Sequence, residues 1–289
     1  MPELPEVEVV KRSLEKKVIN LRINKVKIND GNLRYKVNKK EISNLLGKKI
    51  RKISRRSKFL IFEMDQRIFM LAHLGMTGKF FFINSKNEKL KTSFYYDLNK
   101  SKNHKHDRVI FHFQNNQKLI YNDVRKFGFI KLIKKKNYLE NRHLKFLGPE
   151  PLEKKFNFDY FKKYIFGRNR NIKSILMDQK CVSGLGNIYV NEILFQSCVM
   201  PCRKVSRLKN FEIHKIIVNT KKILKKSIIV GGSSIKDFSS DEGKKGMFQQ
   251  SFGVYGRKGE KCSNVDCNSY IKRSVISNRA TFYCERCQK

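Results

Sequence analysis

Cys262-Ser-Asn-Val-Asp-Cys267 and Cys284-Glu-Arg-Cys287 form the array C-x4-C-x16-C-x2-C at the end of the chain. Four soft ligands in two close pairs, about a hairpin apart, suit a closed tetrahedral Zn²⁺ site. Basic residues within the array indicate that the metal stiffens a hairpin that meets an anion: Lys272, Arg273, Arg279 and Arg286. The alternative is two disulfides in a secreted domain, but MPELPEVE lacks the basic and then apolar run of a signal peptide. We therefore predict one structural zinc ion bound by Cys262, Cys267, Cys284 and Cys287.

The charge of the chain points to a polyanionic partner. Its 289 residues carry 64 Lys and Arg against 25 Asp and Glu, a formal net charge of +39. Neutralising phosphates releases condensed counterions, so nucleic acid is the natural partner. An AT-rich genome would also enrich Lys, Asn and Ile, and that bias accounts for some of the excess. We expect nucleic-acid binding.

A membrane or an oxidising compartment is not expected. No apolar run approaches the twenty residues of a membrane span. Three thiols lie outside the array, Cys181, Cys198 and Cys202, and an odd number fits a reducing cytoplasm better than a disulfide framework.

The apolar pattern predicts a helix over residues 5–17, where Pro5 suits the first turn and Glu6 and Glu8 suit the helix dipole. Short strands follow, and they indicate a β-sandwich or barrel: 59–64, 67–72, 79–83, 107–113, 118–122 and 127–133. Residues 84–106 are polar and are expected to form a long loop.

Gly148-Pro-Glu-Pro151 marks a domain boundary. Helices are then expected at 156–165, 171–180, 187–197 and 208–229, before a glycine-rich stretch over 231–259.

The N-terminal proline is a candidate nucleophile. Removal of Met1 would leave a secondary α-amine at Pro2. The reference pKa of an α-amine is about 8, so roughly a tenth is neutral at pH 7, far more than for a lysine. Such an amine can attack an aldehyde or aminal carbon, and Glu3 and Glu6 could shuttle protons beside it. Most N-terminal prolines have no such role, and acids are ordinary at a helix start.

The N-terminal Met1-Pro-Glu-Leu-Pro-Glu-Val-Glu8, taken with the cysteine array, resembles bacterial formamidopyrimidine-DNA glycosylases, base-excision enzymes for oxidised purines. Similar blocks follow in the family order: Arg55-Arg-Ser-Lys58, His73-Leu-Gly-Met76, Lys105-His-Asp107, Asp123-Val-Arg-Lys-Phe-Gly128, Leu147-Gly-Pro-Glu-Pro-Leu152, Gly184-Leu-Gly-Asn-Ile-Tyr189, Gly231-Gly, Lys236-Asp-Phe238 and Val254-Tyr-Gly-Arg-Lys-Gly259. The resemblance covers essentially the whole chain.

The resemblance implies an α+β fold: an N-terminal helix with a β-sandwich, then a helical domain with a helix–two-turn–helix element and a zinc-finger β-hairpin. It divides the chain into a catalytic domain over 1–148, a helical DNA-binding domain over 149–230, a lesion-capping loop and linker over 231–259, and the zinc finger over 260–289. It further implies a monomeric enzyme of the bacterial cytoplasm, associated with the nucleoid.

The resemblance also assigns the chemistry. Pro2 is the nucleophile that attacks the sugar C1′ and forms a Schiff base, and elimination then breaks the DNA backbone. Glu3 is the acid that assists ring opening, and Glu6 supports it. Lys58 matches the proton donor of β-elimination. Arg279 matches the finger arginine of δ-elimination, which we interpret as a clamp on the departing phosphate, since a guanidinium does not readily lose a proton.

The partner implied is double-stranded DNA with an oxidised base flipped out of the helix. Met76, Arg125 and Phe127 match the intercalating triad, with Arg125 facing the orphaned cytosine; without the resemblance, Met76 and Phe127 would be assigned to the core. His106, Arg168 and Asn187 match DNA-contacting positions, although on the residues alone they are surface side chains and a helix cap.

Three departures from the family pattern are mild. The first cysteine pair is separated by four residues where many members have two, Ser269 replaces Gly, Thr, Ala or Gln, and Val124 stands where Pro is common. None removes a catalytic group.

Two alternative functions remain. A glycosylase of the endonuclease VIII type would prefer oxidised pyrimidines, but Leu4 and the intact set of Met76, Arg125 and Phe127 favour purines. A non-enzymatic zinc-ribbon protein that binds RNA or the ribosome fits the charge and the cysteines, but it does not account for the ordered blocks.

Overall fold

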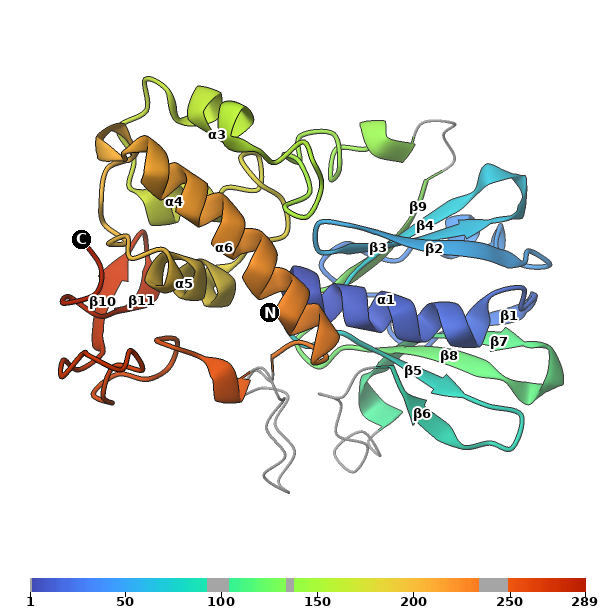
Figure 1. Ribbon diagram of the computed structural model, residues 1–289. Coiled ribbons are helices and arrows are strands. Elements are labelled where there is room, and N and C mark those ends of the chain that lie inside the picture. The colour runs from blue at the N-terminus through green and yellow to red at the C-terminus, as the bar shows by residue number, and fades with distance from the viewer. Residues whose placement is uncertain (1, 93–103, 134–137, 234–248) are drawn as a thin grey trace. The chain divides into compact units, whose positions relative to one another are not determined.

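The computed structural model describes residues 2–92, 104–133, 138–233 and 249–289 (Figure 1). The chain divides into two compact units. Residues 1–145 and 231–247 form the first, and residues 146–230 and 248–289 form the second. The predicted α+β class is confirmed, because the first unit is built on sheets and the second on helices and a hairpin.

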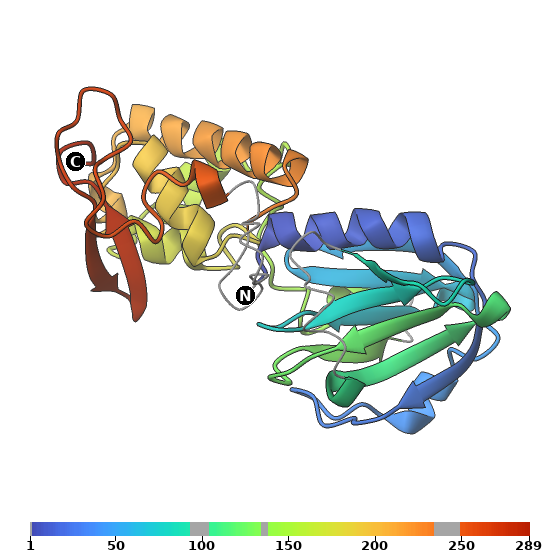
Figure 2. The same cartoon turned by 90° about the horizontal axis from the view of Figure 1, so that it is seen from below.

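The first unit begins with helix α1 (Leu4–Val18). Pro5 lies in its first turn, and Glu3 and Glu6 form a reciprocal capping box at its start. One face of the helix is apolar, and Val7, Val10 and Leu14 on that face are at most 2% exposed. The helix packs on β2 and β3 and runs along the strands of the sandwich (Figures 1 and 2).

Two antiparallel sheets make up the sandwich. One has the strand order β1-β7-β8-β5-β6 and the other β2-β3-β4-β9. Their inner faces share one core rich in Phe, Ile and Leu. The strands are β1 (Ile23–Ile28), β2 (Ile50–Arg56), β3 (Phe59–Met64), β4 (Phe69–His73), β5 (Lys79–Ile83), β6 (Lys89–Lys91), β7 (Asp107–Phe113), β8 (Lys118–Asn122) and β9 (Phe129–Ile133). The described residues of this unit also include a short helix, α2 (Lys39–Ser43), and 3₁₀ turns at Asp65–Arg67, His104–His106, Gln114–Asn116 and Tyr138–Glu140.

The predicted loop over 84–106 is partly wrong. Lys89–Lys91 forms strand β6, which pairs with β5, and His104–His106 forms a 3₁₀ turn. The strand escaped the sequence pattern because it is only three residues long, and Leu90 is its single apolar residue that packs against the core. Residues 93–103 of this predicted loop lie outside the described residues.

The second unit is a small helical domain that carries a hairpin. Its elements are α3 (Phe158–Ile165), α4 (Ile172–Met177), α5 (Asn187–Gln196), α6 (Asn210–Ile229), β10 (Lys272–Ile276) and β11 (Arg279–Tyr283), with 3₁₀ turns at Val205–Arg207 and Gln249–Ser251. The four predicted helices are confirmed, with ends shifted by a few residues. Asn157 and Asn171 set two of the starts, because their side chains accept hydrogen bonds from the backbone of the first turn.

Helix α5 is the centre of the second unit. Eight consecutive residues, Ile188–Phe195, are buried. The helix packs against α4, α6 and β11, so one helix supports both the helical domain and the hairpin (Figure 1). Within the described residues, no helix combines the length and apolarity needed to cross a membrane.

Candidate active site and metal centre

The first cluster of predicted site residues lies at the start of α1. Pro2 is buried, and Glu3 and Glu6 are each 3% exposed. Glu6 Oε2 accepts a hydrogen bond of 2.8 Å from the backbone N–H of Glu3. Its other oxygen, Oε1, accepts from both the backbone N–H and the hydroxyl of Ser233, at 2.8 and 2.9 Å. Glu6 is therefore a fixed acceptor that holds the residue next to Pro2.

Two carboxyl groups close to the N-terminus of a helix are stabilised there by the helix dipole. Their burial beside Pro2 excludes water from this end of α1 and from two groups that can exchange protons. The geometry is thus suited to nucleophilic chemistry at a carbon bonded to oxygen, with Glu3 as the acid closest in sequence.

Lys58 occupies the two-residue turn between β2 and β3, beside Ser57, which adopts a positive φ of 56°. The ammonium-bearing side chain is only 7% exposed. Arg55 fixes this turn by donating to the Ser57 carbonyl at 2.9 Å and to Glu8 of α1 at 2.9 Å. The turn that carries Lys58 is therefore tied to the helix that begins beside Pro2.

His73, at the end of β4, lies among positively charged side chains that include Lys58. Burial, followed by the positive charges of Lys58, Arg34 and His143, lowers the pKa of its imidazole to about 3. The neutral ring accepts a hydrogen bond at Nδ1 from the Gly75 N–H, at 3.0 Å. It also stacks on Phe129, with ring centroids 5.7 Å apart. This contact orders the turn that leads to Met76.

The structure brings Met76, Arg125 and Phe127 together on two adjoining turns. A Cβ at Gly75 would collide with the Phe127 carbonyl carbon and the Gly128 nitrogen, so the two turns are packed backbone to backbone. The Arg125 guanidinium lies 4.7 Å from the centroid of the Phe127 ring, and Phe127 is 46% exposed. An exposed aromatic side chain beside an arginine is unusual for a core element and suits a ligand-facing surface.

His106 lies at the end of a 3₁₀ turn just before β7, and its orientation is set by a buried neighbour. Arg108 is 6% exposed and donates from Nη2 to His106 Nδ1 at 3.2 Å. Arg108 Nη1 also donates to Asp30 at 2.9 Å. An imidazole that accepts at Nδ1 carries its proton on Nε2. Burial and the Arg108 charge lower the pKa of His106, so the ring presents a neutral N–H donor.

In the second unit, Arg168 is exposed and its side chain folds back on Tyr164. The guanidinium lies 4.4 Å from the centre of the Tyr164 ring, and Nε donates to the Tyr164 carbonyl at 2.6 Å. The remaining N–H groups of Arg168 are directed by these two contacts, which pre-orders a donor array.

Asn187, a predicted DNA donor, also contacts the hairpin of the second unit. Asn187 is the first residue of α5, and the N-cap is Gly186 rather than Asn187. Its side-chain Nδ2 donates to the carbonyl of Ala280 in β11, at 2.9 Å. Asn187 therefore anchors the hairpin, and only its second amide hydrogen is available to another acceptor.

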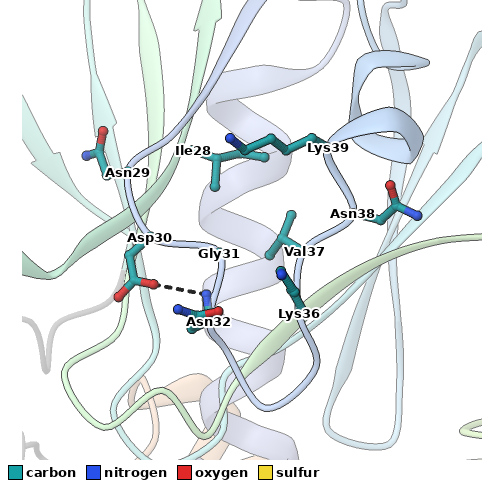
Figure 3. Close-up of a pocket in the computed structure, with 9 residues that line it drawn as sticks. All are labelled: Ile28, Asn29, Asp30, Gly31, Asn32, Lys36, Val37, Asn38 and Lys39. Carbon is teal, nitrogen blue, oxygen red and sulfur yellow. Dashed lines mark hydrogen bonds between the residues drawn. The ribbon is translucent and has the colours of Figure 1, made fainter.

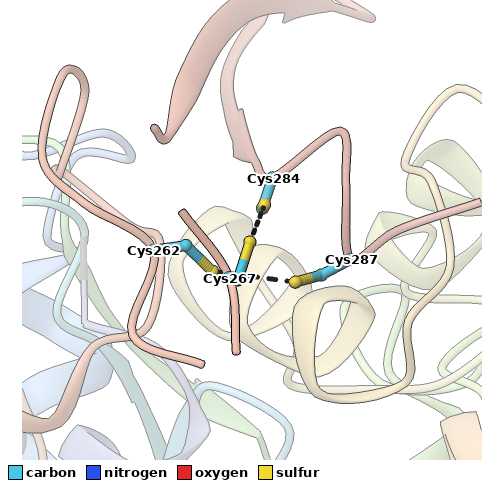
Figure 4. Close-up of side chains that lie close together, drawn as sticks. All are labelled: Cys262, Cys267, Cys284 and Cys287. Carbon is cyan, nitrogen blue, oxygen red and sulfur yellow. Dashed lines mark hydrogen bonds between the residues drawn. The ribbon is translucent and has the colours of Figure 1, made fainter. Parts of the chain in front are cut away.

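The four cysteines converge, as Figure 4 shows. Their Sγ atoms all lie within 4.8 Å of one another, with Cys262–Cys287 at 3.8 Å and Cys267–Cys284 at 3.6 Å. Ligands ~2.3 Å from a tetrahedral Zn²⁺ lie about 3.8 Å apart, so the arrangement fits that ion. The cluster could hold a metal ion with all four positions filled by sulfur.

The hairpin that carries Arg279 is firmly anchored. Ser277 and Asn278 have φ values of 53° and 57°, so the strands β10 and β11 meet in a tight turn directly before the exposed Arg279. Lys173 of α4 is completely buried and donates to the Ala280 carbonyl at 3.0 Å and to Thr281 Oγ1 at 2.7 Å. Burial and then the nearby Arg279 lower the pKa of Lys173 to about 8.

A second anchor joins the finger to α5. Glu192 is 3% exposed and accepts three backbone hydrogen bonds of 2.8, 3.0 and 2.8 Å from Gly253, Val254 and Tyr255. Neither Glu192 nor Lys173 was assigned a role from the sequence. The signal that could have found them is their polarity on otherwise apolar helix faces, since buried charges need partners.

A pocket of about 670 Å³ lies on the loop that follows β1. Figure 3 shows its lining, which comes from Ile28–Asn32 and Lys36–Lys39. None of the predicted site residues lines it. Asp30 at its edge pairs with Lys126, at 2.7 Å, so the loop supports the turn that carries Arg125 and Phe127.

Family models match both parts of the chain. The formamidopyrimidine-DNA glycosylase N-terminal domain matches residues 1–130, and the formamidopyrimidine-DNA glycosylase H2TH domain matches residues 147–239. The formamidopyrimidine-DNA glycosylase of Roseobacter denitrificans is 37% identical over 289 residues, with both chains fully covered. That of Rickettsia felis is 38% identical over 288 residues, covering 100% of this chain and 98% of the relative.

Solved structures agree with this assignment. The Lactococcus lactis Fpg bound to DNA with an abasic site has a TM-score of 0.84, with 34% identity and 99% of each chain covered. A variant of the same enzyme bound to DNA containing Fapy-dG has a TM-score of 0.85, with 34% identity and both chains fully covered. The chain therefore belongs to the formamidopyrimidine-DNA glycosylase family of DNA-repair enzymes.

Proposed function

We propose that this protein is a bifunctional DNA glycosylase and abasic-site lyase that excises oxidised purines, 8-oxoguanine and formamidopyrimidines, from duplex DNA. The observation that carries the proposal is the burial of Pro2 beside Glu3 and Glu6, in the capping box of α1. Relatives of this name and solved complexes with lesion-containing DNA support it.

The chemistry starts at the Pro2 nitrogen once Met1 is removed. The amine attacks C1′ and the bond between C1′ and the base breaks, and the base leaves with the proton that the amine loses. Glu3 protonates O4′ as the sugar ring opens, and a Schiff base remains between Pro2 and C1′. Glu6 holds the backbone N–H of Glu3 and keeps this acid in place.

Two eliminations then cleave the strand. Water takes a proton from C2′ as the C3′–O bond breaks, and Lys58 gives a proton to the departing phosphate oxygen. In a second elimination water takes the C4′ proton and the C5′–O bond breaks, and Arg279 stabilises the departing phosphate through its N–H groups. Lys58 is 7% exposed, so a proton donor there would be largely shielded from bulk water.

DNA binding would use the exposed groups of both units. Met76 and Phe127 fill the space of the flipped base, and Arg125 faces the orphaned cytosine. His106, Arg168 and Asn187 contact phosphates as N–H donors. Cys262, Cys267, Cys284 and Cys287 would hold one structural Zn²⁺, which fixes the finger and takes no part in the chemistry. The lesion-capping role assigned to residues 231–259 depends largely on 234–248, including Lys236-Asp-Phe238, which lie outside the described residues.

A trapping experiment tests the proposal. The protein is incubated with a duplex carrying 8-oxoguanine opposite cytosine in the presence of borohydride, and the covalent adduct is mapped by peptide mass spectrometry. We expect an adduct at Pro2. The variant Pro201→Ala is the control, because Pro201 lies far along the chain from the N-terminus. It should form the same covalent adduct as the wild type. An adduct elsewhere, or one formed only with oxidised-pyrimidine duplexes, would contradict the proposal and favour the endonuclease VIII type.

A further inference from the structure

The two turns that carry Met76, Arg125 and Phe127 are joined by a buried polar pair. Asp123 is completely buried, and its Oδ1 accepts a hydrogen bond of 2.5 Å from the hydroxyl of Thr77. The same hydroxyl oxygen accepts from the Arg125 N–H at 3.0 Å. Asp123 Oδ2 accepts from the Gly128 N–H at 2.9 Å. Three bonds therefore connect the residue after Met76 to both ends of the segment that contains Phe127.

The surroundings of the pair leave little freedom. The Asp123 carbonyl accepts from Arg108 Nε at 2.8 Å, and its N–H donates to the His106 carbonyl at 3.0 Å. Tyr121 donates to the His73 carbonyl at 3.1 Å, and a Cβ at Gly128 would collide with the Tyr121 hydroxyl. Since each polar group has a partner, the network is rigid rather than adaptable.

We propose that Thr77 and Asp123 are the positioning pair that holds Met76, Arg125 and Phe127 as one rigid base-displacing unit, an inference that rests on the proposed function. Neither residue faces the substrate, because Thr77 is 7% and Asp123 0% exposed. They act through the turns on either side. A side chain that takes the place of a base in the DNA stack must already be in position when the base leaves. If the two turns were mobile, contacts between these side chains and the DNA would no longer offset the free-energy cost of unstacking.

Thr77 is the sharper position to change, because its hydroxyl donates one bond and accepts another. Thr77→Val keeps the shape and removes both bonds, leaving the Arg125 N–H and a carboxylate oxygen without their partner. Thr77→Ser keeps the hydroxyl and is the matched control. If Thr77 acted only by filling space, Thr77→Val would be the more active of the two variants, because Val fills the space of Thr and Ser does not.

The test compares the wild type, Thr77→Val and Thr77→Ser on two substrates. We expect Thr77→Val to slow single-turnover excision of 8-oxoguanine from duplex DNA by about tenfold or more, as the loss of one buried partner predicts. Cleavage of a single-stranded oligonucleotide with a preformed abasic site needs no base displacement and should stay within about twofold. Thr77→Ser should restore duplex excision. Wild-type excision by Thr77→Val, or equal loss on both substrates, would overturn the proposal.

A measurement that requires no bond cleavage tests this inference separately from the proposed function. The fluorescence of 2-aminopurine placed beside an uncleavable abasic analogue rises when the stack is opened. We expect the rise with the wild type and Thr77→Ser but not with Thr77→Val. Absence of strand cleavage by the wild type would overturn the proposed function alone, whereas equal fluorescence for all three proteins would overturn the positioning pair.

Discussion

Glu6 and Ser233 are 227 positions apart in the chain, yet they meet in two hydrogen bonds. Glu6 Oε1 accepts from the Ser233 N–H at 2.8 Å and from its hydroxyl at 2.9 Å. The other oxygen accepts from the Glu3 N–H at 2.8 Å. One buried carboxylate thus ties the residue beside the proposed nucleophile to the chain at Ser233. A change at Glu6 should therefore affect the proposed chemistry more than a change at Ser233.

Glu6→Gln is expected to slow excision of 8-oxoguanine by about tenfold to a hundredfold. The amide keeps one acceptor but turns an NH₂ group toward a backbone donor, at a cost of about 1–3 kcal/mol. Ser233→Ala removes one of three bonds and should cost about 1 kcal/mol or less. Single-turnover kinetics of the two variants give the comparison. Equal rates for Glu6→Gln and the wild type would show that this carboxylate does not support the reaction.

Loss of the metal should remove the finger and DNA binding together. The apolar core around the cysteines is small and includes the cysteines themselves, so we expect the finger to depend on the proposed metal for its stability. Cys284→Ser is expected to bind less than about half of the zinc of the wild type and to lose at least tenfold in affinity for abasic-site duplex. Metal analysis and fluorescence anisotropy measure these quantities. Cys202→Ser, an exposed thiol outside the array, should change neither.

The depressed pKa of His73 predicts acid sensitivity. The pKa falls to about 3 in the folded protein, mainly through burial and then through Lys58, Arg34 and His143, while an unfolded histidine titrates near 6.5. The neutral ring is favoured by folding, so its contribution is complete above about pH 6.5 and declines as the pH falls toward 3.

His73→Asn carries no titrating group, so it should lose about 2 kcal/mol less unfolding free energy than the wild type between pH 7.5 and pH 4.5. Urea unfolding at the two pH values measures the difference. His214→Asn, at an exposed ring stacked on Phe158, should follow the wild type. Parallel losses in the wild type and His73→Asn would show that His73 does not couple folding to pH.

Charge should dominate affinity for undamaged DNA. With a net charge of +39, several phosphates are neutralised on binding, so the logarithm of the association constant should fall steeply and linearly with the logarithm of the salt concentration. Between 50 and 200 mM salt, a loss of about 10³ or more is expected if six or more phosphates are contacted. Arg168→Ala should reduce the slope by about one. A slope near zero would exclude phosphate contacts as the main source of affinity.

Local pattern was enough to predict the elements that bury an apolar face. Strands 107–113 and 118–122, and the start of α5 at Asn187, match the structure because alternation and helix-start signals are local. The convergence of the four cysteines also followed from their spacing. Strand β6 was missed because pairing with β5, rather than its own composition, makes Lys89–Lys91 a strand.

Contacts between distant residues could not be predicted in this way. Thr77 and Asp123 are 46 positions apart, and Lys173 lies 107 positions before the carbonyl to which it donates. Nothing near Thr77 in the sequence distinguishes a hydroxyl that bridges two turns from one at the surface. Asn187 is a further case. It begins helix α5, and its side chain also donates to the carbonyl of Ala280, but the local sequence would be the same without that contact.

Glu192 gives the sharpest test of how the finger is held. Its carboxylate accepts from three consecutive backbone N–H groups, of Gly253, Val254 and Tyr255, just before the first cysteine pair. Glu192→Gln replaces one acceptor oxygen with a donor that faces a backbone donor. We expect a loss of about 2–4 kcal/mol in unfolding free energy, because breaking a buried charged network leaves donors unpaired. Glu260→Gln, whose carboxylate is 58% exposed and pairs with Arg257, is the control and should cost less than about 1 kcal/mol. Near-equal stabilities of the two variants in urea unfolding would show that the three hydrogen bonds do not stabilise the finger.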